Sequence, residues 1–261
     1  MGSKSIFAGV VLLSTICFVA CESTARILTK DGRTNTMRLI STNGVNLIKL
    51  TNNLYAGQCE ITNGDYKVFL KAIARDPQRL CANMVDTSVW AKYKYAEPLV
   101  KHYWQWSEFN DYPVVGITWQ AANDYCRWLS EQSDVYSYRL PTEQEWKLMV
   151  AEPNAKGMDL PCPDGYSEEY GAFCFNFWAV DSMNNTACDG GYFTVRADAY
   201  WTNINGFLNL HGNVAEMTGD NNVCKGGGWY DKYEDCSMYT QKQYTLPSAE
   251  VGFRVVATKR F

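Results

Sequence analysis

Ten Tyr, Asp, Ser and Thr side chains near the end of the 261-residue sequence have the composition of a recognition surface. They follow the glycine run Gly226, Gly227 and Gly228 and the apolar anchor Trp229. Tyrosine offers a large amphipathic contact area at low entropic cost, and Ser, Thr and Asp add adaptable hydrogen bonding. We therefore predict a binding segment over residues 226–256, with a solvated, Tyr-rich hairpin as the alternative. The candidate contact residues are Tyr230, Asp231, Tyr233, Asp235, Ser237, Tyr239, Thr240, Tyr244, Thr245 and Ser248.

A second candidate site lies at the turn that Gly212 and Asn213 mark. Asn209 and Glu216 could direct oxygen atoms toward the place where the backbone carbonyls of Gly212 and Val214 lie. Oxygen ligands of this kind suit calcium. The same residues could instead form a hydrogen-bonded turn without a metal.

Composition and charge exclude several classes of function. With 46% hydrophobic residues the chain can bury a sizeable core, and we expect a single domain. A net charge of −4, without a run of Lys or Arg, argues against binding to nucleic acid or to an anionic membrane surface. The two histidines, His102 and His211, offer little for a His-rich metal centre or a His-based catalytic triad.

The first twenty residues have the pattern of an export signal. Lys4 precedes an apolar run over residues 6–20, which is too short for a comfortable membrane span. The run ends in FVAC, which resembles a bacterial lipobox, so we expect Cys21 to be lipidated after cleavage. The sequence then predicts an exported lipoprotein, anchored at the outer membrane or cell surface. An ordinary secretory signal is the alternative.

Eight cysteines remain when Cys17 and Cys21 are set aside. Export would permit disulfides, although eight cysteines allow about 105 pairings. Cys162 and Cys174 bracket a Gly-containing segment and are the expected local bridge. The sequence contains no CxxC pair, which argues against a zinc site.

Several local signals predict the elements that would position these residues. Residues 21–45 are polar and Thr-rich and suggest a tether between lipid and domain. Thr62 with Asp65, and Thr142 with Glu145, have capping-box spacing, and Thr118 also suits a helix N-cap.

Other segments predict strands and loops. Residues 112–117 and 251–256 are short, β-branched runs that predict strands, and the second should be buried. Residues 75–107 are aromatic-rich and predict only loops and turns. Residues 157–203 form a long irregular stretch, which in a compact domain is usually functional or cross-linked.

Six of these segments occur in an order that matches a known family: LYAGQCEITNGDYKVFL, YPVVGITWQAANDYCRWL, YRLPTEQEWKLM, LNLHGNVAEMT, KGGGW and VGFRVV. Together they resemble the formylglycine-generating, or sulfatase-modifying, domain family. The resemblance implies an irregular, loop-rich α+β domain related to the C-type lectin fold over residues 46–261. It also implies calcium at the GNVAE motif.

The resemblance does not extend to the family's catalytic centre. The oxidases of the family bind copper through two cysteines shortly after the glycine run. Here the first of those positions is Asp231, and only the second, Cys236, is a cysteine. Because copper(I) prefers soft thiolates and Asp is a hard ligand, we expect no oxidase activity. Iron-dependent relatives need a His-rich helical domain, for which this chain has too few histidines.

A different branch resembles the chain more closely, namely the variable proteins of diversity-generating retroelements of the treponeme type. These proteins place hypervariable residues between GG.W and GFRVV, and adenine-directed mutagenesis of Asn codons yields Tyr, Asp, Ser, Thr or Asn. All ten candidate residues belong to that set. Trp229, Cys236 and Met238 would form the inward framework of a strand that displays its other face.

The resemblance therefore implies a displayed lipoprotein that binds a protein or another macromolecule and requires no cofactor. Two alternatives remain open. One is a divergent oxidase with an altered centre near Cys236, and the other is an invariant structural lipoprotein of the envelope.

Overall fold

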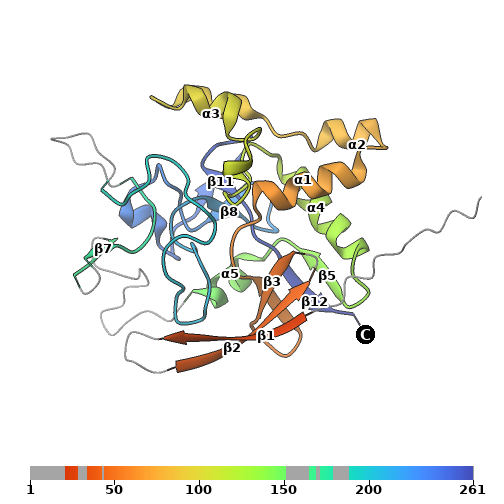
Figure 1. Ribbon diagram of the computed structural model, residues 1–261, viewed down its shortest axis with the longest axis vertical. Helices are drawn as coiled ribbons and strands as arrows, with labels where there is room; N and C mark the ends of the chain where they lie inside the picture. Colours follow the sequence, from red (N-terminus) through yellow and green to blue (C-terminus); the bar gives the residue numbers. More distant parts are fainter. Residues whose placement is uncertain are drawn as a thin grey trace, which may run out of the picture.

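The computed structural model describes residues 21–28, 34–42, 44–150, 165–168, 171–178 and 188–260 (Figure 1). Helices and short strands alternate with long loops in this part of the chain. The strands are β1 (Cys21–Leu28), β2 (Thr34–Thr42), β3 (Val45–Lys49), β4 (Leu54–Gly57), β5 (Tyr136–Arg139), β6 (Tyr166–Ser167), β7 (Ala172–Phe173), β8 (Ala215–Met217), β9 (Val223–Lys225), β10 (Lys242–Gln243), β11 (Val251–Gly252) and β12 (Val256–Lys259). The helices are α1 (Asn63–Ile73), α2 (Pro77–Ala82), α3 (Glu97–His102), α4 (Trp119–Glu131) and α5 (Glu143–Met149), with 3₁₀ turns η1 (Thr87–Lys92), η2 (Ser107–Phe109) and η4 (Tyr233–Cys236).

The larger sheet joins distant parts of the sequence. Its order is β1-β2-β3-β4-β12-β5, and all neighbouring strands are antiparallel. Strand β12, close to the C-terminal end, lies between β4 and β5, so that Val256 pairs with Ala56 on one side and with Arg139 on the other. The last strand therefore closes the domain against two earlier segments. The predicted α+β class is confirmed.

Residues 21–45 differ from the tether that the sequence suggested. Strands β1 and β2 pair along their length, and β2 continues the sheet by pairing with β3. The polar sequence of this segment, which lacks a regular apolar periodicity, gave no signal for the backbone pairing that defines these strands. Thr is also favoured in strands by its β-branched side chain.

The helix starts agree with the local signals. The Thr62 side chain accepts a hydrogen bond from the Asp65 backbone, and the Asp65 carboxylate accepts one from the Thr62 backbone. Thr142 and Glu145 form the same reciprocal capping box before α5. The Thr118 side chain caps α4. These three predictions are confirmed, as expected for signals that act within one turn of chain.

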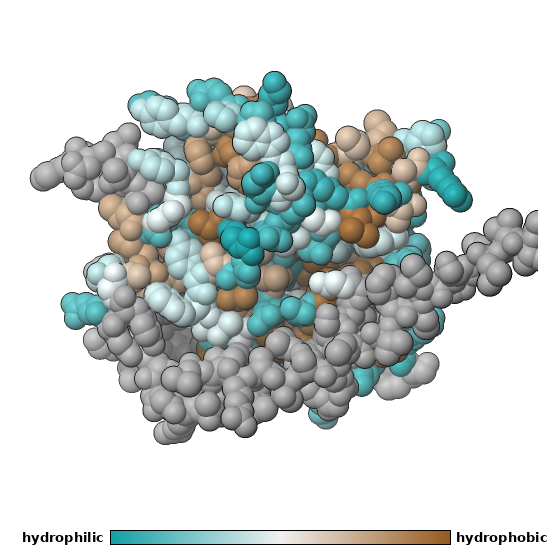
Figure 2. All heavy atoms as spheres, viewed as in Figure 1, coloured by the Kyte–Doolittle hydropathy of each residue, from teal (hydrophilic) through white to brown (hydrophobic). Residues whose placement is uncertain are grey.

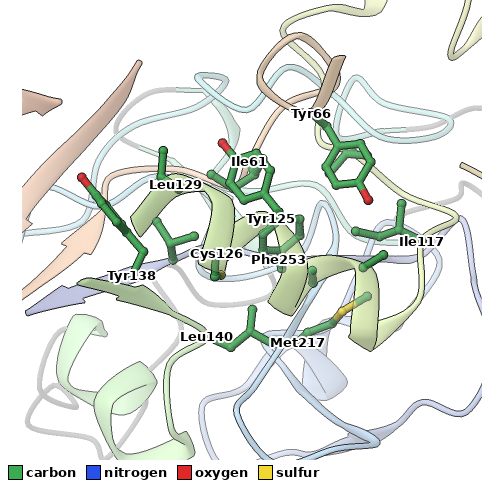
Figure 3. Packing of buried hydrophobic residues seen from close by; sticks show 14 of the residues in the cluster. Ile61, Tyr66, Ile117, Tyr125, Cys126, Leu129, Tyr138, Leu140, Met217 and Phe253 are labelled. Carbon is green, nitrogen blue, oxygen red and sulfur yellow. The ribbon is translucent and has the colours of Figure 1, made fainter. Parts of the chain in front are cut away.

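Aromatic rings from α1 and α4 form the centre of the main core (Figure 3). The rings of Tyr66 and Tyr125 stack with centroids 5.8 Å apart, and Phe253 meets Tyr125 edge-on at 5.4 Å. Residues of the loops and of both larger sheets complete this cluster. The core thus fixes the C-terminal segment against α4.

The run 251–256, predicted as one buried strand, is buried but divided. Strand β11 pairs in parallel with β8 in the four-stranded sheet, whose order is β10-β9-β8-β11. The chain then crosses to the larger sheet, where β12 begins at Val256. A Cβ at Gly252 would come within 2.8 Å of the Val214 side chain, so this crossing requires glycine. The strand predicted over residues 112–117 is limited to an isolated bridge between Pro113 and Thr62.

The predictions for the N-terminal region and for the cysteines have different outcomes. The signal segment, residues 1–20, and Cys162 lie outside the described residues. Cys174 is disulfide-bonded. None of the helices in the described part of the chain is long and apolar enough to cross a membrane. Lipidation of Cys21 and the domain boundaries remain predictions.

Candidate functional site

The glycine run directs Trp229 into the protein. Gly226 and Gly227 have φ angles of +89° and +65°, and a Cβ at Gly227 would lie 2.7 Å from the Cys236 sulfur. Trp229 is consequently buried, its indole nitrogen donates to the Ala249 carbonyl at 2.9 Å, and its ring stacks on Trp90. The base of the candidate segment is therefore a rigid part of the core.

The ten candidate contact residues occupy different depths. Four are exposed, namely Tyr230, Asp235, Tyr239 and Thr245. Five are half-buried, namely Asp231, Tyr233, Ser237, Thr240 and Ser248. Tyr244 is buried, with only 5% of its surface exposed. The structure therefore brings most of the set to the surface, without placing them all there.

Tyr244 is a correction to the predicted contact set. Its ring belongs to the main core, and its hydroxyl donates to the Ile117 carbonyl. The chain turns inward after β10, and the backbone of Tyr244 donates to the Asn222 carbonyl. Composition suggested display because Tyr is common both on binding surfaces and in cores, where its hydroxyl finds a partner.

The predicted strand through Asp235, Ser237 and Tyr239 is also wrong. Residues 233–236 form the 3₁₀ turn η4, and Ser237 ends it. Cys236 nevertheless points inward and is buried, as the alternating pattern suggested. A short 3₁₀ turn can bury a single residue and expose its neighbours, so the pattern did not distinguish it from a strand.

Tyr233 and Asp231 make contacts within the protein that stabilise the C-terminal segment, so they are less available to a ligand than the exposed residues. The Tyr233 ring stacks on Phe175 at 5.9 Å and meets Phe177 edge-on. The Asp231 carboxylate accepts hydrogen bonds from the Gly228 backbone at 2.8 Å and from the Lys242 amine. Burial lowers the pKa of Lys242, but the carboxylates of Asp231 and Glu250 outweigh burial and raise it. Lys242 is thus a charged tie across the base of the segment.

The same residues test the copper dithiolate of the family oxidases. Asp231 stands at the first ligand position and is engaged by Lys242, whose ammonium group would repel an incoming metal cation. Burial raises the pKa of the Cys236 thiol, which therefore stays protonated. One neutral thiol and one hard, ion-paired carboxylate do not fit a copper site.

The carboxylate of the candidate calcium site is engaged by other protein groups, and calcium binding by the four residues stays a prediction. Both carboxylate oxygens of Glu216 are bound by the Arg254 guanidinium, and Trp146 donates to one of them at 2.7 Å. The Asn209 amide nitrogen donates to the Ala197 carbonyl at 3.1 Å, and the backbone of Gly212 donates to Gly226. Val214 packs in an apolar cluster with Trp229.

The pairing of Glu216 with Arg254 favours the alternative interpretation, a hydrogen-bonded turn, at this residue. A cation cannot share the Glu216 carboxylate with a buried guanidinium without strong repulsion. Sequence could not reveal this pairing because Arg254 lies 38 residues further along the chain.

Glu60 is a buried carboxyl that the sequence did not single out. Burial raises its pKa to about 8, although the nearby Arg254 guanidinium acts in the opposite direction. The Asn213 amide donates to Glu60 at 2.8 Å. Glu60 thus joins the turn at Asn213 to the segment between β4 and α1 from inside the protein.

An aromatic pocket beside Tyr230 was also not predicted. Eight residues line it, and all except Lys94 are aromatic: Tyr93, Lys94, Tyr95, Trp178, Tyr192, Phe193, Trp229 and Tyr230. Residues 75–107, expected to be loops, contain α2, η1 and α3, and they supply the Tyr93 side of the pocket. Their richness in aromatic residues was the available signal, but it carried no periodicity that could assign a face.

The visible surface around these elements is mixed. Figure 2 shows hydrophilic and hydrophobic residues interspersed over the described part of this face.

Comparisons with known proteins agree with this architecture. The chain is 32% identical over 111 residues to the formylglycine-generating enzyme of Bos taurus, a match that covers 42% of this chain and 27% of that protein. It is 28% identical over 161 residues to the inactive C-alpha-formylglycine-generating enzyme 2 of Bos taurus, covering 55% of this chain and 50% of that protein. The matches thus span half or less of these relatives.

Two solved structures share the fold. PvdO from Pseudomonas aeruginosa aligns with a TM-score of 0.58 at 17% identity, over 92% of each chain. Treponema denticola variable protein 1 aligns with a TM-score of 0.50 at 15% identity, over 91% of this chain and 92% of that chain. The family model for the sulfatase-modifying factor enzyme 1-like domain matches residues 22–259. A match of this extent, on the fold described above, means that the chain belongs to the sulfatase-modifying factor enzyme 1-like domain family.

Proposed function

We propose that this protein is an exported lipoprotein that binds a protein ligand through a retroelement-diversified surface on its C-terminal segment. The observation that carries the proposal is the separation between display and framework within residues 226–256. Tyr230, Asp235, Tyr239 and Thr245 are exposed, while Trp229 and Cys236 beside them are buried. A surface that must accept many side chains cannot depend on those side chains for folding.

The framework is braced by contacts that do not use the exposed positions. Lys225, wholly buried, donates to the Thr240 carbonyl and lies 3.5 Å from Glu143 of α5. Lys242 ties Asp231 to Glu250. Changes at Tyr239 or Thr245 would leave these ties intact. The half-buried positions, including Asp231 and Tyr233, would vary less freely because the framework uses them.

Binding without catalysis fits the composition of the site. The family includes enzymes, and the relatives include a protein named inactive C-alpha-formylglycine-generating enzyme 2. In this chain the position of the first copper ligand holds Asp231 in an ion pair with Lys242. We therefore assign the protein no redox activity and no required cofactor. Its membrane contact would be the lipid on Cys21 alone, and its net charge of −4 does not suit a nucleic-acid partner.

Sequencing the gene codon by codon from Gly226 to Phe261 across a cell population tests the proposal. We expect substitutions concentrated at Tyr230, Asp235, Tyr239 and Thr245, with fewer at the half-buried positions. Trp229, Cys236, Gly252 and Phe253 should stay fixed, because they form the framework. A uniform sequence over the whole segment would refute diversification and leave the invariant envelope lipoprotein as the better explanation.

A second experiment tests display directly in the protein. A library in which the four exposed positions are randomised should retain cooperative unfolding in most members. A matched library at Trp229, Cys236, Tyr244 and Phe253 should lose it, because those side chains are buried. Equal loss of folding in the two libraries would contradict the separation of display from framework.

A further inference from the structure

The aromatic pocket has a rigid floor and exposed walls. The floor consists of Tyr93, Phe193 and Trp229, whose rings meet edge-on, with centroids 4.7 Å apart for Tyr93 and Trp229 and 5.3 Å for Phe193 and Trp229. Trp178 and Tyr230 form one wall, with ring centroids 4.6 Å apart at 66°. Both wall residues are more than 40% exposed. The space that these residues border measures about 440 Å³ with the solvent at its open side included, so the pocket is a partly open hollow beside exposed rings.

Backbone contacts and backbone strain fix the positions of two residues that line the pocket, Trp178 and Tyr95. The Trp178 backbone donates to the Asp231 carbonyl at 2.8 Å, which ties the wall to the C-terminal segment. Tyr95 has a φ of +67° although it is not glycine, and its side chain is 57% exposed. Left-handed conformations of large residues are uncommon and tend to occur at functional sites. An exposed ring held in this way indicates a positioned contact surface.

Positive charge lies at the rim. The Lys94 amine sits 4.7 Å from the centre of the Tyr95 ring, and the Lys92 amine lies at the same distance from the Tyr93 ring. Lys92 also pairs with Glu250 at 3.5 Å, whereas no ion pair to Lys94 is formed by the described residues. The nearby carboxylates are engaged, since Asp231 and Glu250 both pair with Lys242. The rim therefore favours a negatively charged group over a cation.

We propose that this pocket is an anchor site for an aromatic side chain with a neighbouring carboxylate, presented by an acidic segment of a protein partner. The inference rests on the proposed function in one respect, that the C-terminal surface meets a protein. The pocket itself differs from the diversified surface, because only Tyr230 of its eight lining residues belongs to the candidate contact set. Buried or half-enclosed aromatic anchors are typical of the residues that dominate binding energy.

Three small probes that share a phenyl ring and differ in the charged or neutral group at the other end test the pocket in the full protein. They are 3-phenylpropionate, 3-phenylpropan-1-ol and 3-phenylpropylammonium, and their binding is followed by saturation-transfer NMR with titration. We expect the propionate to bind roughly two- to five-fold more tightly than the alcohol, the ratio typical of one solvent-exposed ion pair. The ammonium probe should bind most weakly.

Two variants assign the binding to the pocket. Lys94→Gln should remove the preference for the propionate, because the rim loses its charge, and Lys71→Gln on α1 is the matched control. Trp178→Ala should abolish saturation transfer from the protein to all three probes. Trp106→Ala, which removes an exposed Trp outside the pocket, should leave the transfer unchanged. Lys94 and Trp178 are exposed, so the fold should survive both changes.

Several outcomes would overturn the proposal. These are tighter binding of the ammonium probe or of tetramethylammonium, binding that persists in Trp178→Ala, or absence of binding by the propionate. Failure of the proposed function is a separate result. If the gene shows no diversification but the propionate binds as expected, the pocket stands as a site. If diversification is found and the propionate does not bind, only the anchor site fails.

Discussion

The guanidinium of Arg254 binds both carboxylate oxygens of Glu216 in the interior of the protein, with Nε 2.6 Å from Oε2. Both side chains are essentially inaccessible to solvent. The same guanidinium donates to the carbonyls of Gly57, Gln58 and Leu208. Arg254 therefore links the end of β4, the loop before the Gly212 turn, and β8.

Breaking this pair on one side should destabilise the protein strongly. Glu216→Gln or Arg254→Met leaves an uncompensated buried partner, and the expected loss is about 3–5 kcal/mol in the free energy of unfolding measured with urea. Arg196→Gln is the control, since its pairs with Asp111 and Asp198 are exposed, and it should change stability little. Single variants at Glu216 and Arg254 that unfold like the wild type would contradict the structural role of the pair.

Truncation of Trp229 should lower the free energy of unfolding strongly, whereas truncation of Tyr239 should hardly change it, although both residues belong to the C-terminal segment. Trp229→Ala removes a ring that is 2% exposed, and it should cost about 3–5 kcal/mol. Tyr239 is 62% exposed, so Tyr239→Ala should stay within about 0.5 kcal/mol of the wild type. Urea unfolding of the two variants side by side measures the difference. A large loss in Tyr239→Ala would mean that the displayed surface supports the fold.

Calcium should not change the stability of this protein. The Glu216 carboxylate is already neutralised by Arg254, so it is not free to bind a divalent ion. Thermal unfolding in 1 mM calcium chloride and in EDTA should give the same midpoint. A midpoint that rises with calcium in the wild type, and does not rise in Asn209→Ala, would restore the original metal-site expectation.

Glu60 should make the protein less stable as the pH rises from about 4.5 to about 8. Burial raises the pKa of Glu60 to about 8 in the folded protein, above its value of about 4.3 in an unfolded chain. Over this range the unfolded state releases a proton that the folded state retains, so stability is greatest at the acidic end and is lost toward pH 8.

The magnitude can be checked with one substitution. Glu60→Gln cannot titrate but can still accept the hydrogen bond from Asn213, so about 2–4 kcal/mol of the decline in unfolding free energy between pH 5 and pH 8 should disappear. The exposed Glu97→Gln should retain the wild-type decline. Parallel pH profiles for wild type and Glu60→Gln would show that Glu60 does not titrate in this range.

The sequence by itself determined the features that depend on neighbouring residues. Local residue patterns predicted the capping boxes at Thr62 and Thr142 and the glycine geometry before Trp229, because each of these acts within a few positions of the chain. The order of the family motifs could also be taken directly from the sequence. The family and the α+β class followed from those motifs. The predicted strand over residues 251–256 had the right burial, since a short β-branched run signals burial more reliably than strand continuity.

Only the tertiary structure decided which polar side chains are free to meet a ligand. Tyr244 was assigned to the binding surface by composition, but its hydroxyl finds Ile117, 127 residues away in the sequence. Glu216 was predicted as a calcium ligand, but in the structure its carboxylate pairs with Arg254, which lies in the segment that crosses between the two sheets. The aromatic pocket likewise combines Tyr93, Trp178 and Tyr230 from three separate segments. The physical reason is common to all three cases, because burial and pairing depend on contacts that chain folding creates, and local residue patterns carry no record of them.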